Sequence, residues 1–586
     1  MDVAWMTPQT SLRLHRMDSS LSHPGPLYGL PCPTIDHILL ESRILSIVSQ
    51  TSFSQSPTPD IELAACRALW NARKPINNLP VELLVDILMR LPSNGFDVAT
   101  TTPSSTSQCF QCMCVCRHWR TVIASNGCFW RTIHTGERTR WLQLSLARAG
   151  AANLRLKFTQ AAGLISALPD LLSRRDHIER LDFTCQTLSD IHALAPLICA
   201  PLPCMSELAM LYGNVGNSST GLARKDLLAL QPENFPALIR LRLVHASLPW
   251  TVSLLSRLRS LHLGSCQVYP SPISVSRLSN VLRCGNALEE LTLHDFLGTA
   301  CSADGSGLSQ PMDALTLPRL RKLDISDAPA WIAEFVAYIQ LPPEGDVILT
   351  GQVEDPQAVS ALGLASMLPQ NHRGAGFLRS ATGASLFMLE GKHWVVCEAP
   401  GPLKVTLQLR ARTTRVLWTQ TLDDGLRHFT TLFHPAPLTA LTLQCDLAKV
   451  APDALADALD AFPHIQELTI ASSTFGPDPF PMHLCDSLRA RTGSEWEDEK
   501  DGGRGRVRCA SLKVLCLENV RWEDGAFMNA VADCLRERER LGAPKLELLA
   551  ITASRSPEVD WSEPDARFAD ILAPMVGEYE FCGKGW

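Results

Sequence analysis

Apolar residues recur at helical spacing in two short blocks near the N-terminal end of the chain. In the block INNLPVELLVDILMRLP, apolar residues lie three and four positions apart, which places them on one stripe of a helix. The members of this stripe are Leu83, Leu84, Ile87, Leu88 and Leu91. Pro80 precedes them and suits the first turn of a helix, where a missing backbone N–H costs nothing. The pattern therefore predicts a short amphipathic helix that begins near Pro80.

The second block, CMCVCRHWRTVIASNGCFWRTI, has the same period. One side of the predicted helix is apolar and consists of Cys112, Val115, Cys116, Trp119, Val122 and Ile123. Arg117, His118 and Arg120 lie on the opposite side, and Trp130 follows as a separate apolar anchor. Helices this short cannot bury so much apolar surface among themselves, so we expect them to dock against another surface.

The order of residues in these two blocks resembles an F-box. The shared residues are Leu-Pro-x-Glu-Leu-Leu at 79–84, Val-Cys-Arg-x-Trp-Arg at 115–120 and Phe-Trp at 129–130. The resemblance implies binding to a Skp-type adaptor and, through it, to a cullin-RING ubiquitin ligase. The residues expected to form the adaptor surface or its immediate support are Leu79, Pro80, Leu83, Ile87, Val115, Cys116, Trp119 and Trp130. Residues 93–108 separate the two blocks where the family usually has a brief link, and their Ser, Thr, Pro and Gly content predicts a surface loop.

Beyond this segment the pattern apolar-x-x-apolar-x-apolar recurs. Its first run begins at residues 178, 205, 238, 258, 288 and 320, and it returns at residues 438, 465, 512 and 546. The steps within the first run suit one strand and one helix per unit, which indicates a solenoid whose units stack on their neighbours. The motif resembles leucine-rich repeats. The Asn or Cys expected after the strand is present in LRSLHLGSCQV as Cys266, but most units lack it, which predicts an irregular stack.

Two intervals in this series are too long for one unit. Between residues 465 and 512 the excess falls in a charged, Gly-containing stretch at 493–506, which predicts an exposed loop. The interval from 320 to 438 is too long for a loop in a compact domain. Strand-like patterns occur within it at residues 346–350, 385–389, 393–397 and 403–409. Residues 326–437 therefore either add three or four divergent units or separate two short solenoids.

These patterns predict the organisation of the whole chain. Residues 1–33 are rich in Ser, Pro and Leu without a clear period and are predicted to be disordered. Residues 34–75 contain helical patterns that resemble the lead-in of many fungal F-box proteins, although an ordinary amphipathic helix explains them equally well. The F-box-like segment spans 76–135, and residues 150–586 form the repeat region. The predicted fold class is α/β, with a short helical F-box followed by a leucine-rich-repeat-like solenoid.

Composition and charge favour a folded chain without nucleic-acid or membrane partners. At 586 residues, 46% apolar and 19% charged, the chain exceeds one hydrophobic core and has the composition of folded soluble proteins. A net charge of −7 is small for this length and argues against a dedicated nucleic-acid binder. No apolar segment has the pattern of a signal peptide or the length of roughly 18 residues that a membrane span needs. We therefore expect the 20 cysteines to be reduced, in the cytoplasm or nucleus.

The sequence contains no motif that points to catalysis or to a cofactor. Candidate metal ligands cluster at Cys109, Cys112, Cys114, Cys116 and His118. A second pair of ligands at the spacing of a zinc site is missing, so we expect no metal site. Phosphate-binding loops, nucleophile elbows and His-Glu-x-x-His motifs are also missing, so we expect no catalytic or cofactor-binding residues. In the F-box family the transfer chemistry belongs to other subunits.

Charged residues between the apolar positions of the strands are candidates for target recognition. In a leucine-rich repeat these side chains point to the concave, solvent-facing surface, because alternate strand residues face opposite sides. A predicted basic zone on two neighbouring strands consists of Arg240, Arg242, Arg259 and His262. It fits an acidic or phosphorylated segment of a target protein, whereas the alternative is a plain solvated strand face.

Together these patterns predict a substrate-recruiting subunit of an SCF-type cullin-RING ubiquitin ligase, which binds a Skp-type adaptor and an unknown protein substrate. One alternative is a non-degradative scaffold that uses the same solenoid to bind a partner. Another is an enzyme hidden within residues 326–437.

Overall fold

The computed structural model of the chain resolves two compact units, Met1–Val98 with Gln108–Ile123 and Ala99–Ser107 with Ala124–Trp586. We call the first the helical unit and the second the sheet unit. The structure describes residues 42–47, 58–91, 111–135, 139–212, 230–248, 252–268, 273–301, 314–342, 344–354, 363–369, 376–389, 392–398, 401–412, 422–434, 436–446, 449–472, 483–489, 507–520, 526–554 and 562–584. The predicted disordered N-terminus (1–33), the inserted loop (93–108) and the charged loop (493–506) lie outside the described residues.

The helical unit is formed by short helices. Besides helical segments at residues 42–47 and 111–115, it contains α2 (Thr58–Ala72), the 3₁₀-helix η1 (Pro75–Asn78), α3 (Val81–Arg90) and most of α5 (Arg117–Ser125). The first predicted helix is α3, and Pro80 occupies its N-cap position. The second predicted helix is interrupted at Cys116, where the structure differs from the continuous stripe expected from the sequence. The Cys116 sulfur accepts the N–H of Trp119 at 3.4 Å, so this side chain caps the start of a new helix.

The sheet unit is built on one sheet of 17 strands. Followed from one strand pairing to the next, the strands are β1 (Thr132–Thr135), β2 (Leu154–Phe158), β3 (Ile178–Cys185), β4 (Glu207–Tyr212), β5 (Arg240–Val244), β7 (Ser260–Gly264), β9 (Glu290–His294), β11 (Lys322–Asp327), β13 (Gly345–Val353), β16 (Leu403–Ala411), β15 (Lys392–Glu398), β14 (Gly383–Leu389), β17 (Ala440–Cys445), β18 (Glu467–Ser472), β19 (Val514–Val520), β20 (Leu548–Ser554) and β21 (Glu578–Lys584). The described pairings are parallel except those of β15, which runs antiparallel to both β14 and β16.

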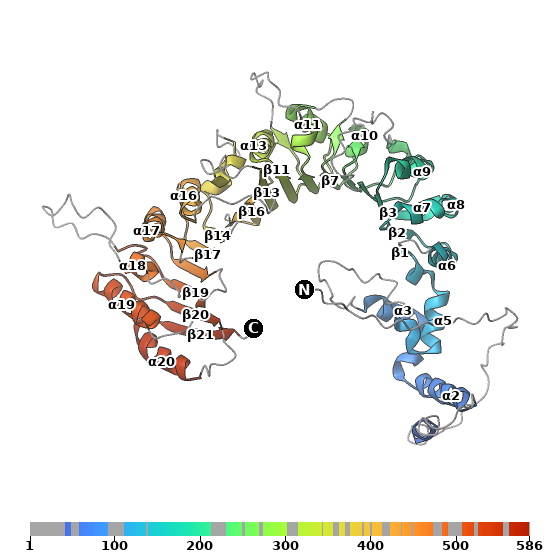
Figure 1. The fold of residues 1–586 in the computed structure, drawn as a ribbon, viewed down its shortest axis with the longest axis horizontal. Coiled ribbons are helices and arrows are strands. Elements are labelled where there is room, and N and C mark those ends of the chain that lie inside the picture. Colours follow the sequence, from blue (N-terminus) through green and yellow to red (C-terminus); the bar gives the residue numbers. More distant parts are fainter. Residues whose placement is uncertain are drawn as a thin grey trace, which may run out of the picture. The chain divides into compact units, whose positions relative to one another are not determined.

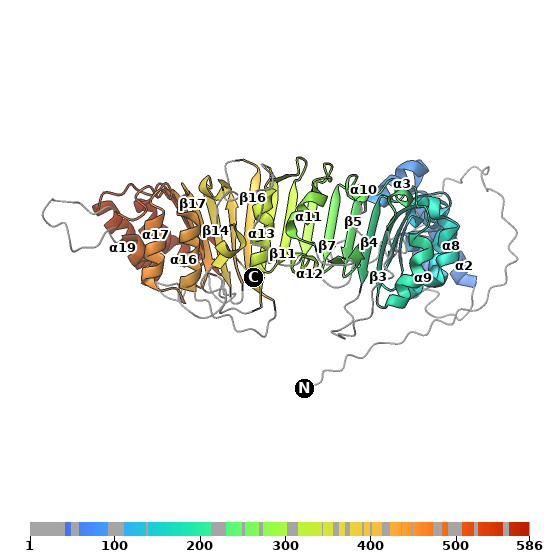
Figure 2. The same ribbon diagram turned by 90° about the horizontal axis from the view of Figure 1, so that it is seen from above.

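Helices of the sheet unit lie on one side of this sheet (Figures 1 and 2). The described α-helices are α6 (Thr139–Ala149), α7 (Ala161–Ser166), α8 (Leu168–Leu172), α9 (Leu188–Ile198), α10 (Val252–Leu255), α11 (Val275–Leu282), α12 (Leu297–Ala300), α13 (Pro329–Tyr338), α15 (Gly376–Arg379), α16 (Leu422–Phe433), α17 (Pro452–Ala461), α18 (His483–Arg489), α19 (Ala526–Arg540) and α20 (Ser562–Leu572). Short 3₁₀-helices are η2 (Gly127–Trp130), η3 (Arg175–His177), η4 (Pro232–Asn234), η5 (Gly363–Met367) and η8 (Ala573–Met575). Two small sheets pair β6 (Ser247–Leu248) with β8 (Gln267–Val268) and β10 (Leu315–Thr316) with β12 (Ile339–Gln340). We call the sheet face away from the helices the open face.

The apolar motif found in the sequence marks the strands. All ten of its occurrences fall on strands, which confirms the predicted β3, β4, β5, β7, β9, β11, β17, β18, β19 and β20. Along each strand the apolar positions are buried and the positions between them are more exposed, as in the pattern of Arg240–Val244. Leu241, Leu261 and Leu291 are aligned across β5, β7 and β9 and are at most 3% exposed. Each such burial stabilises the fold by about 1.5–3 kcal/mol relative to an exposed side chain.

A recurring turn follows three consecutive strands. His245, Ser265 and Asp295 come directly after β5, β7 and β9 and adopt φ angles of 55°, 46° and 48°. The N–H of each donates to a backbone carbonyl of the following strand at 2.7 Å. Next to one of these turns, the buried thiol of Cys266 donates to the carbonyl of Leu243 at 3.3 Å. This hydrogen bond links the segment after β7 to β5.

Residues 326–437 carry four strands of the same sheet. The strand-like patterns in this stretch are confirmed as β13, β14, β15 and β16. β14, β15 and β16 occur in the sheet in the reverse of their order in the sequence, because β16 pairs with β13 and β14 pairs with the following β17. The sheet therefore continues through this stretch by way of a local antiparallel meander.

The described cysteines are all free thiols, and several of them face the core. Burial raises the pKa of Cys266 to about 11 and the pKa of Cys397 and Cys445 to about 12. Because the thiolate is the reactive form, these side chains behave as small apolar groups. Among the helices that the structure describes, none combines the length and apolar character that a bilayer-spanning helix requires.

His393 on β15 predicts a loss of stability in mild acid. Its side chain is 2% exposed, and burial, followed by the nearby His428, lowers its pKa from 6.5 to about 4, while Asp424 acts in the opposite direction. Between these values the unfolded chain binds a proton that the folded chain does not, so stability falls as pH drops from 6.5 to about 4. His393→Leu should remove about 3 kcal/mol of this acid destabilisation, measured by urea unfolding at pH 7 and pH 4.

The exposed His464 provides the control, since His464→Leu removes an imidazole that is not buried. A difference in unfolding free energy between wild type and His393→Leu that stays constant with pH would contradict the prediction.

Candidate functional site

Large apolar side chains are exposed at the surface of the helical unit. Besides Leu45 and Leu69 they are Val81, Leu83, Ile87, Met89, Leu91 and Val115, and we call these last six the exposed apolar set. Leu83 and Val115 are 53% and 55% exposed, respectively. These six side chains are most of the exposed large apolar residues in the described part of the chain. Clustered apolar side chains at a surface mark interaction sites, because contact with a partner removes them from water.

The apolar stripe of α3 has a buried part and an exposed part. Leu84 and Leu88 are buried within the unit, whereas Leu83 and Ile87 are exposed. Each pair is separated by four residues and therefore shares one line along the helix. One part of α3 thus anchors the helix, and the adjacent part remains available for a partner.

Hydrogen bonds of Trp119 support this arrangement. The indole Nε1–H of Trp119 on α5 donates to Oδ1 of Asn77 at 2.6 Å. The Asn77 amide Nδ2 in turn donates to the backbone carbonyl of Asn71 on α2 at 2.6 Å. Val122 and Ile123 on α5 are buried beside this network. Asn77, which the sequence patterns did not single out, therefore links η1 to both α2 and α5.

Asn77→Ala is expected to destabilise the helical unit by about 1–2 kcal/mol, because it leaves the half-buried indole N–H without its acceptor. Thermal unfolding of the full chain measures the effect. Asn78→Ala is the matched control, because Asn78 is the exposed neighbour on the same 3₁₀-helix. Equal effects of the two substitutions would show that the network contributes nothing.

The structure places the predicted adaptor residues at three depths. Pro80, Leu83, Ile87 and Val115 are exposed, Leu79 and Trp119 are half-buried, and Cys116 and Trp130 are buried. Trp130 belongs to the sheet unit, where its ring centroid lies 5.4 Å from that of Trp141 and its ring is covered by the Arg148 guanidinium at 4.7 Å. Trp130 is therefore a buried residue of the sheet unit and not part of an exposed surface. Val81, Met89 and Leu91 also belong to the exposed apolar set but are not among the predicted adaptor residues.

Alternation along β5 and β7 places Arg240, Arg242 and His262 of the predicted basic zone on the open face, whereas Arg259 precedes β7. Much of the charge of the zone is compensated. Arg242 and His262 are aligned on β5 and β7. Arg240 donates to the carboxylate of Glu207 at 2.7 Å. Arg259 lies 3.7 Å from the carboxylate of Glu289.

The imidazole of His262 adds no positive charge at neutral pH. Burial, with smaller contributions from Arg242 and His294, lowers the pKa of His262 to about 4. In the described part of the chain, Arg242 is therefore the one cation of the predicted basic zone that has no carboxylate partner. The zone is weaker as an anion site than the sequence alone suggests.

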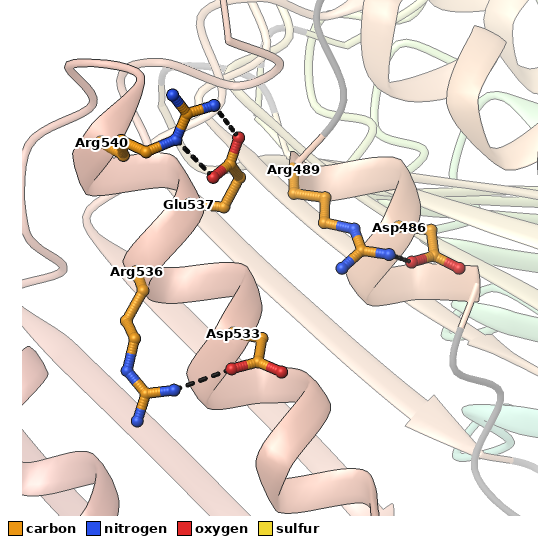
Figure 3. A pocket seen from close by; sticks show the side chains of 6 residues that line it. All are labelled: Asp486, Arg489, Asp533, Arg536, Glu537 and Arg540. Atoms are coloured by element: carbon orange, nitrogen blue, oxygen red, sulfur yellow. Dashed lines mark hydrogen bonds and ion pairs between the residues drawn. The ribbon is translucent and has the colours of Figure 1, made fainter.

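A pocket of about 600 Å³ opens between α18 and α19 (Figure 3). It is lined by Asp486, Arg489, Asp533, Arg536, Glu537 and Arg540. Each carboxylate pairs with the arginine three residues later on its own helix, as Figure 3 shows. Exposed pairs of this kind contribute little to stability, because water and salt screen them. The pocket has equal numbers of arginines and carboxylates, so its charge favours neither anions nor cations. Small-molecule sites usually have apolar walls, which this pocket lacks. The lining therefore indicates no class of ligand.

Besides the thiol of Cys397, two described groups within residues 326–437 have shifted pKa values. Burial raises the pKa of Asp327, whose carboxylate accepts the backbone N–H groups of Gly298 and Ala328 at 3.2 and 2.8 Å. Burial also lowers the pKa of His393. Both shifts arise in the packed interior, and the pocket between α18 and α19 lies outside this stretch.

The candidate metal ligands do not assemble into a site in the described part of the chain. No group of three or more His, Cys, Asp or Glu side chains there could hold a metal ion. Cys112 and Cys114 lie on the helix at 111–115, and Cys116 caps α5. Cys109 lies outside the described residues.

Comparison with known proteins bears on the N-terminal part of the chain. A comparison with curated proteins gives no match. Residues 76–135 match the model of the F-box-like family, and this segment contains the whole exposed apolar set. F-box domains generally bind Skp-type adaptors, and proteins that carry them are typically the adaptor-binding subunits of SCF ligases. The chain thus contains an F-box-like domain at residues 76–135.

Proposed function

We propose that this chain is a substrate-recruiting F-box subunit of an SCF-type cullin-RING ubiquitin ligase. It binds a Skp-type adaptor through the helical unit and a target protein through the sheet unit. The observation that carries this proposal is the exposed apolar set within the F-box-like domain. Such a surface gains about 1.5–3 kcal/mol for each large side chain that a partner buries, before the cost of association.

The sheet unit is proposed to be an irregular leucine-rich-repeat solenoid. Parallel pairing of neighbouring strands from β2 to β13, which include the six motif strands from β3 to β11, supports this interpretation. The recurring turn and the hydrogen bond of Cys266 also support it. A target would bind on the open face, where the side chains between the buried positions lie.

The chain is proposed to act by binding alone, in the cytoplasm or nucleus. Ubiquitin transfer would be carried out by the other subunits of the ligase. The free thiols of the described cysteines fit a reducing compartment. A scaffold that binds the adaptor without a cullin is the competing function, and the experiment below separates the two.

The full chain, mixed with a purified Skp-type adaptor and cullin, tests the proposal by size-exclusion chromatography. We expect the three proteins to elute as one complex. Elution with the adaptor but without the cullin would favour the scaffold, and failure to bind the adaptor would reject both. Affinity purification with and without a proteasome inhibitor then identifies substrates as the proteins enriched only under inhibition.

A further inference from the structure

Around the antiparallel strand β15, the open face carries aromatic and cationic side chains. Alternation along β14, β15 and β16 places several side chains there, among them Phe387, Leu389, Lys392, Trp394 and Arg410. Phe387 is aligned with Trp394, and Lys392 is aligned with both Leu389 and Arg410. Aligned residues on neighbouring strands have adjacent side chains, so the five form one patch. We call it the aromatic-cationic patch.

The apolar part of the patch is built from stacked rings. Phe387 and Trp394 stack with centroids 4.7 Å apart and ring planes 5° from parallel. The ammonium group of Lys392 lies over the Trp394 ring, 4.5 Å from its centroid. Both rings are half-buried, and Leu389 beside them is 40% exposed. Large, rigid aromatic side chains that are already held in place are typical anchors of protein interfaces, because they lose little conformational freedom on binding.

The cationic part of the patch differs from most of the arginines on the strands between β2 and β9. Four arginines there pair with a carboxylate, as Arg155–Glu179, Arg180–Glu207, Arg240–Glu207 and Arg259–Glu289, whereas Arg242 forms no such pair among the described residues. Within the described residues, neither Lys392 nor Arg410 forms an ion pair with a carboxylate. The Arg410 guanidinium reaches the Ser326 hydroxyl at 3.5 Å. Two adjacent uncompensated cations create a local positive potential that an anionic partner would neutralise.

We infer that the aromatic-cationic patch docks an extended acidic segment of a partner protein. The segment would place a large apolar side chain against Trp394, Phe387 and Leu389. It would place a carboxylate beside Lys392 and Arg410, where the planar guanidinium can hold it with two hydrogen bonds. Identification of this segment as the ubiquitylation target rests on the proposed function, whereas binding at the patch does not.

The geometry favours a protein segment over a nucleic acid. Single-stranded nucleic acids bind aromatic residues chiefly by stacking bases on free ring faces. Here Phe387 and Lys392 already engage the ring of Trp394. A base would have to displace these contacts in order to stack on Trp394, whereas the neighbouring exposed Leu389 suits contact with an aliphatic or aromatic side chain. The net charge of −7 also opposes general attraction to nucleic acid.

A phage-displayed library of random linear peptides, selected against the full chain, tests the inference. We expect the enriched sequences to combine Asp or Glu with a neighbouring Leu, Phe, Tyr or Trp. A synthetic peptide of the enriched sequence is then measured by fluorescence anisotropy at several salt concentrations. Trp394→Ala should weaken its binding by about 30-fold, as expected for an aromatic anchor.

Charge reversal tests the second half of the patch without disturbing buried side chains. Lys392→Glu with Arg410→Glu should weaken binding by about 100-fold at low salt and by less at high salt. A peptide with Lys in place of its acidic residue should restore binding to this double variant. Arg242→Glu is the matched control, because Arg242 is an unpaired cation on the same face, and it should leave binding within about 3-fold of wild type.

Several results would overturn the inference. These are loss of binding in Arg242→Glu but not in the charge-reversed variant, binding only of phosphorylated peptides, and competition by single-stranded oligonucleotides at the same patch. Self-association of the chain that the patch variants abolish would likewise assign the surface to a second copy. Adaptor binding is measured in parallel, so that the two proposals are tested separately. Normal adaptor binding without any selected peptide would reject the docking patch alone. Peptide binding at the patch without adaptor binding would reject the ligase function alone.

Discussion

Leu83→Glu combined with Val115→Glu is expected to abolish binding of a Skp-type adaptor. Both side chains belong to the exposed apolar set, one from α3 and one from the helix at 111–115. A carboxylate at either position would have to lose its water at the interface without gaining a partner. If each residue contributes about 2 kcal/mol as an anchor, the pair lowers affinity by roughly 1,000-fold. Isothermal titration calorimetry of the full chain with purified adaptor measures the loss.

The exposure of Leu83 and Val115 also separates an effect on adaptor binding from an effect on folding. Because both side chains are already more than half exposed, their replacement should leave the thermal unfolding of the chain unchanged. Leu144→Glu is the matched control, since Leu144 is a large exposed apolar residue on α6 in the sheet unit. It should bind the adaptor as wild type does. Normal adaptor binding by the folded double variant would reject the assignment of the surface.

The helical period of α3 identified the helix but not the role of each side chain. Periodicity groups Leu83, Leu84, Ile87 and Leu88 into one stripe, because it reports only the angle around the helix axis. Which part of a broad stripe is covered depends on the neighbouring helices. The interruption at Cys116 was equally hidden, since a thiol can occupy an apolar helical position or cap a new helix.

In the sheet unit, the repeated apolar motif predicted the strands because each strand buries apolar residues on one face. It did not predict the direction of β15 or the reversed order of β14 and β16. Alternation of buried and exposed positions is the same in parallel and antiparallel strands, so the pattern of Lys392–Glu398 is compatible with either. Strand direction is set by long-range pairing that a local pattern does not record.

The predicted basic zone shows a related limit. The sequence shows Arg240 beside Arg242, but the carboxylate of Glu207 that pairs with Arg240 lies 33 residues earlier. Only stacking of β4 on β5 brings these two side chains together. By contrast, the sequence pattern did not predict that Lys392 and Arg410 are neighbours, because 18 residues separate them. The antiparallel pairing of β15 with β16 brings them together.

A second large effect is expected from Arg538 on α19, a buried arginine whose partners are backbone carbonyls. Its side chain is 3% exposed, and burial lowers its pKa. The guanidinium donates to the carbonyl oxygens of Leu488, Arg508 and Cys509 at 2.8, 2.7 and 2.9 Å. Leu488 lies on α18, and the other two residues precede β19. One side chain therefore satisfies acceptors from two separate segments next to α19.

Arg538→Ala should destabilise the sheet unit by about 4 kcal/mol, because three buried carbonyl groups lose a charged donor and a cavity replaces the side chain. Urea unfolding followed by circular dichroism measures this loss. Arg538→Lys should recover only part of it, since a single ammonium cannot reproduce the planar fork of the guanidinium. Arg536→Ala, two residues earlier on the same helix, removes an exposed arginine paired with Asp533 and should cost less than about 1 kcal/mol. Equal losses for Arg538→Ala and Arg536→Ala would mean that the bonds to the carbonyls add nothing beyond a surface ion pair.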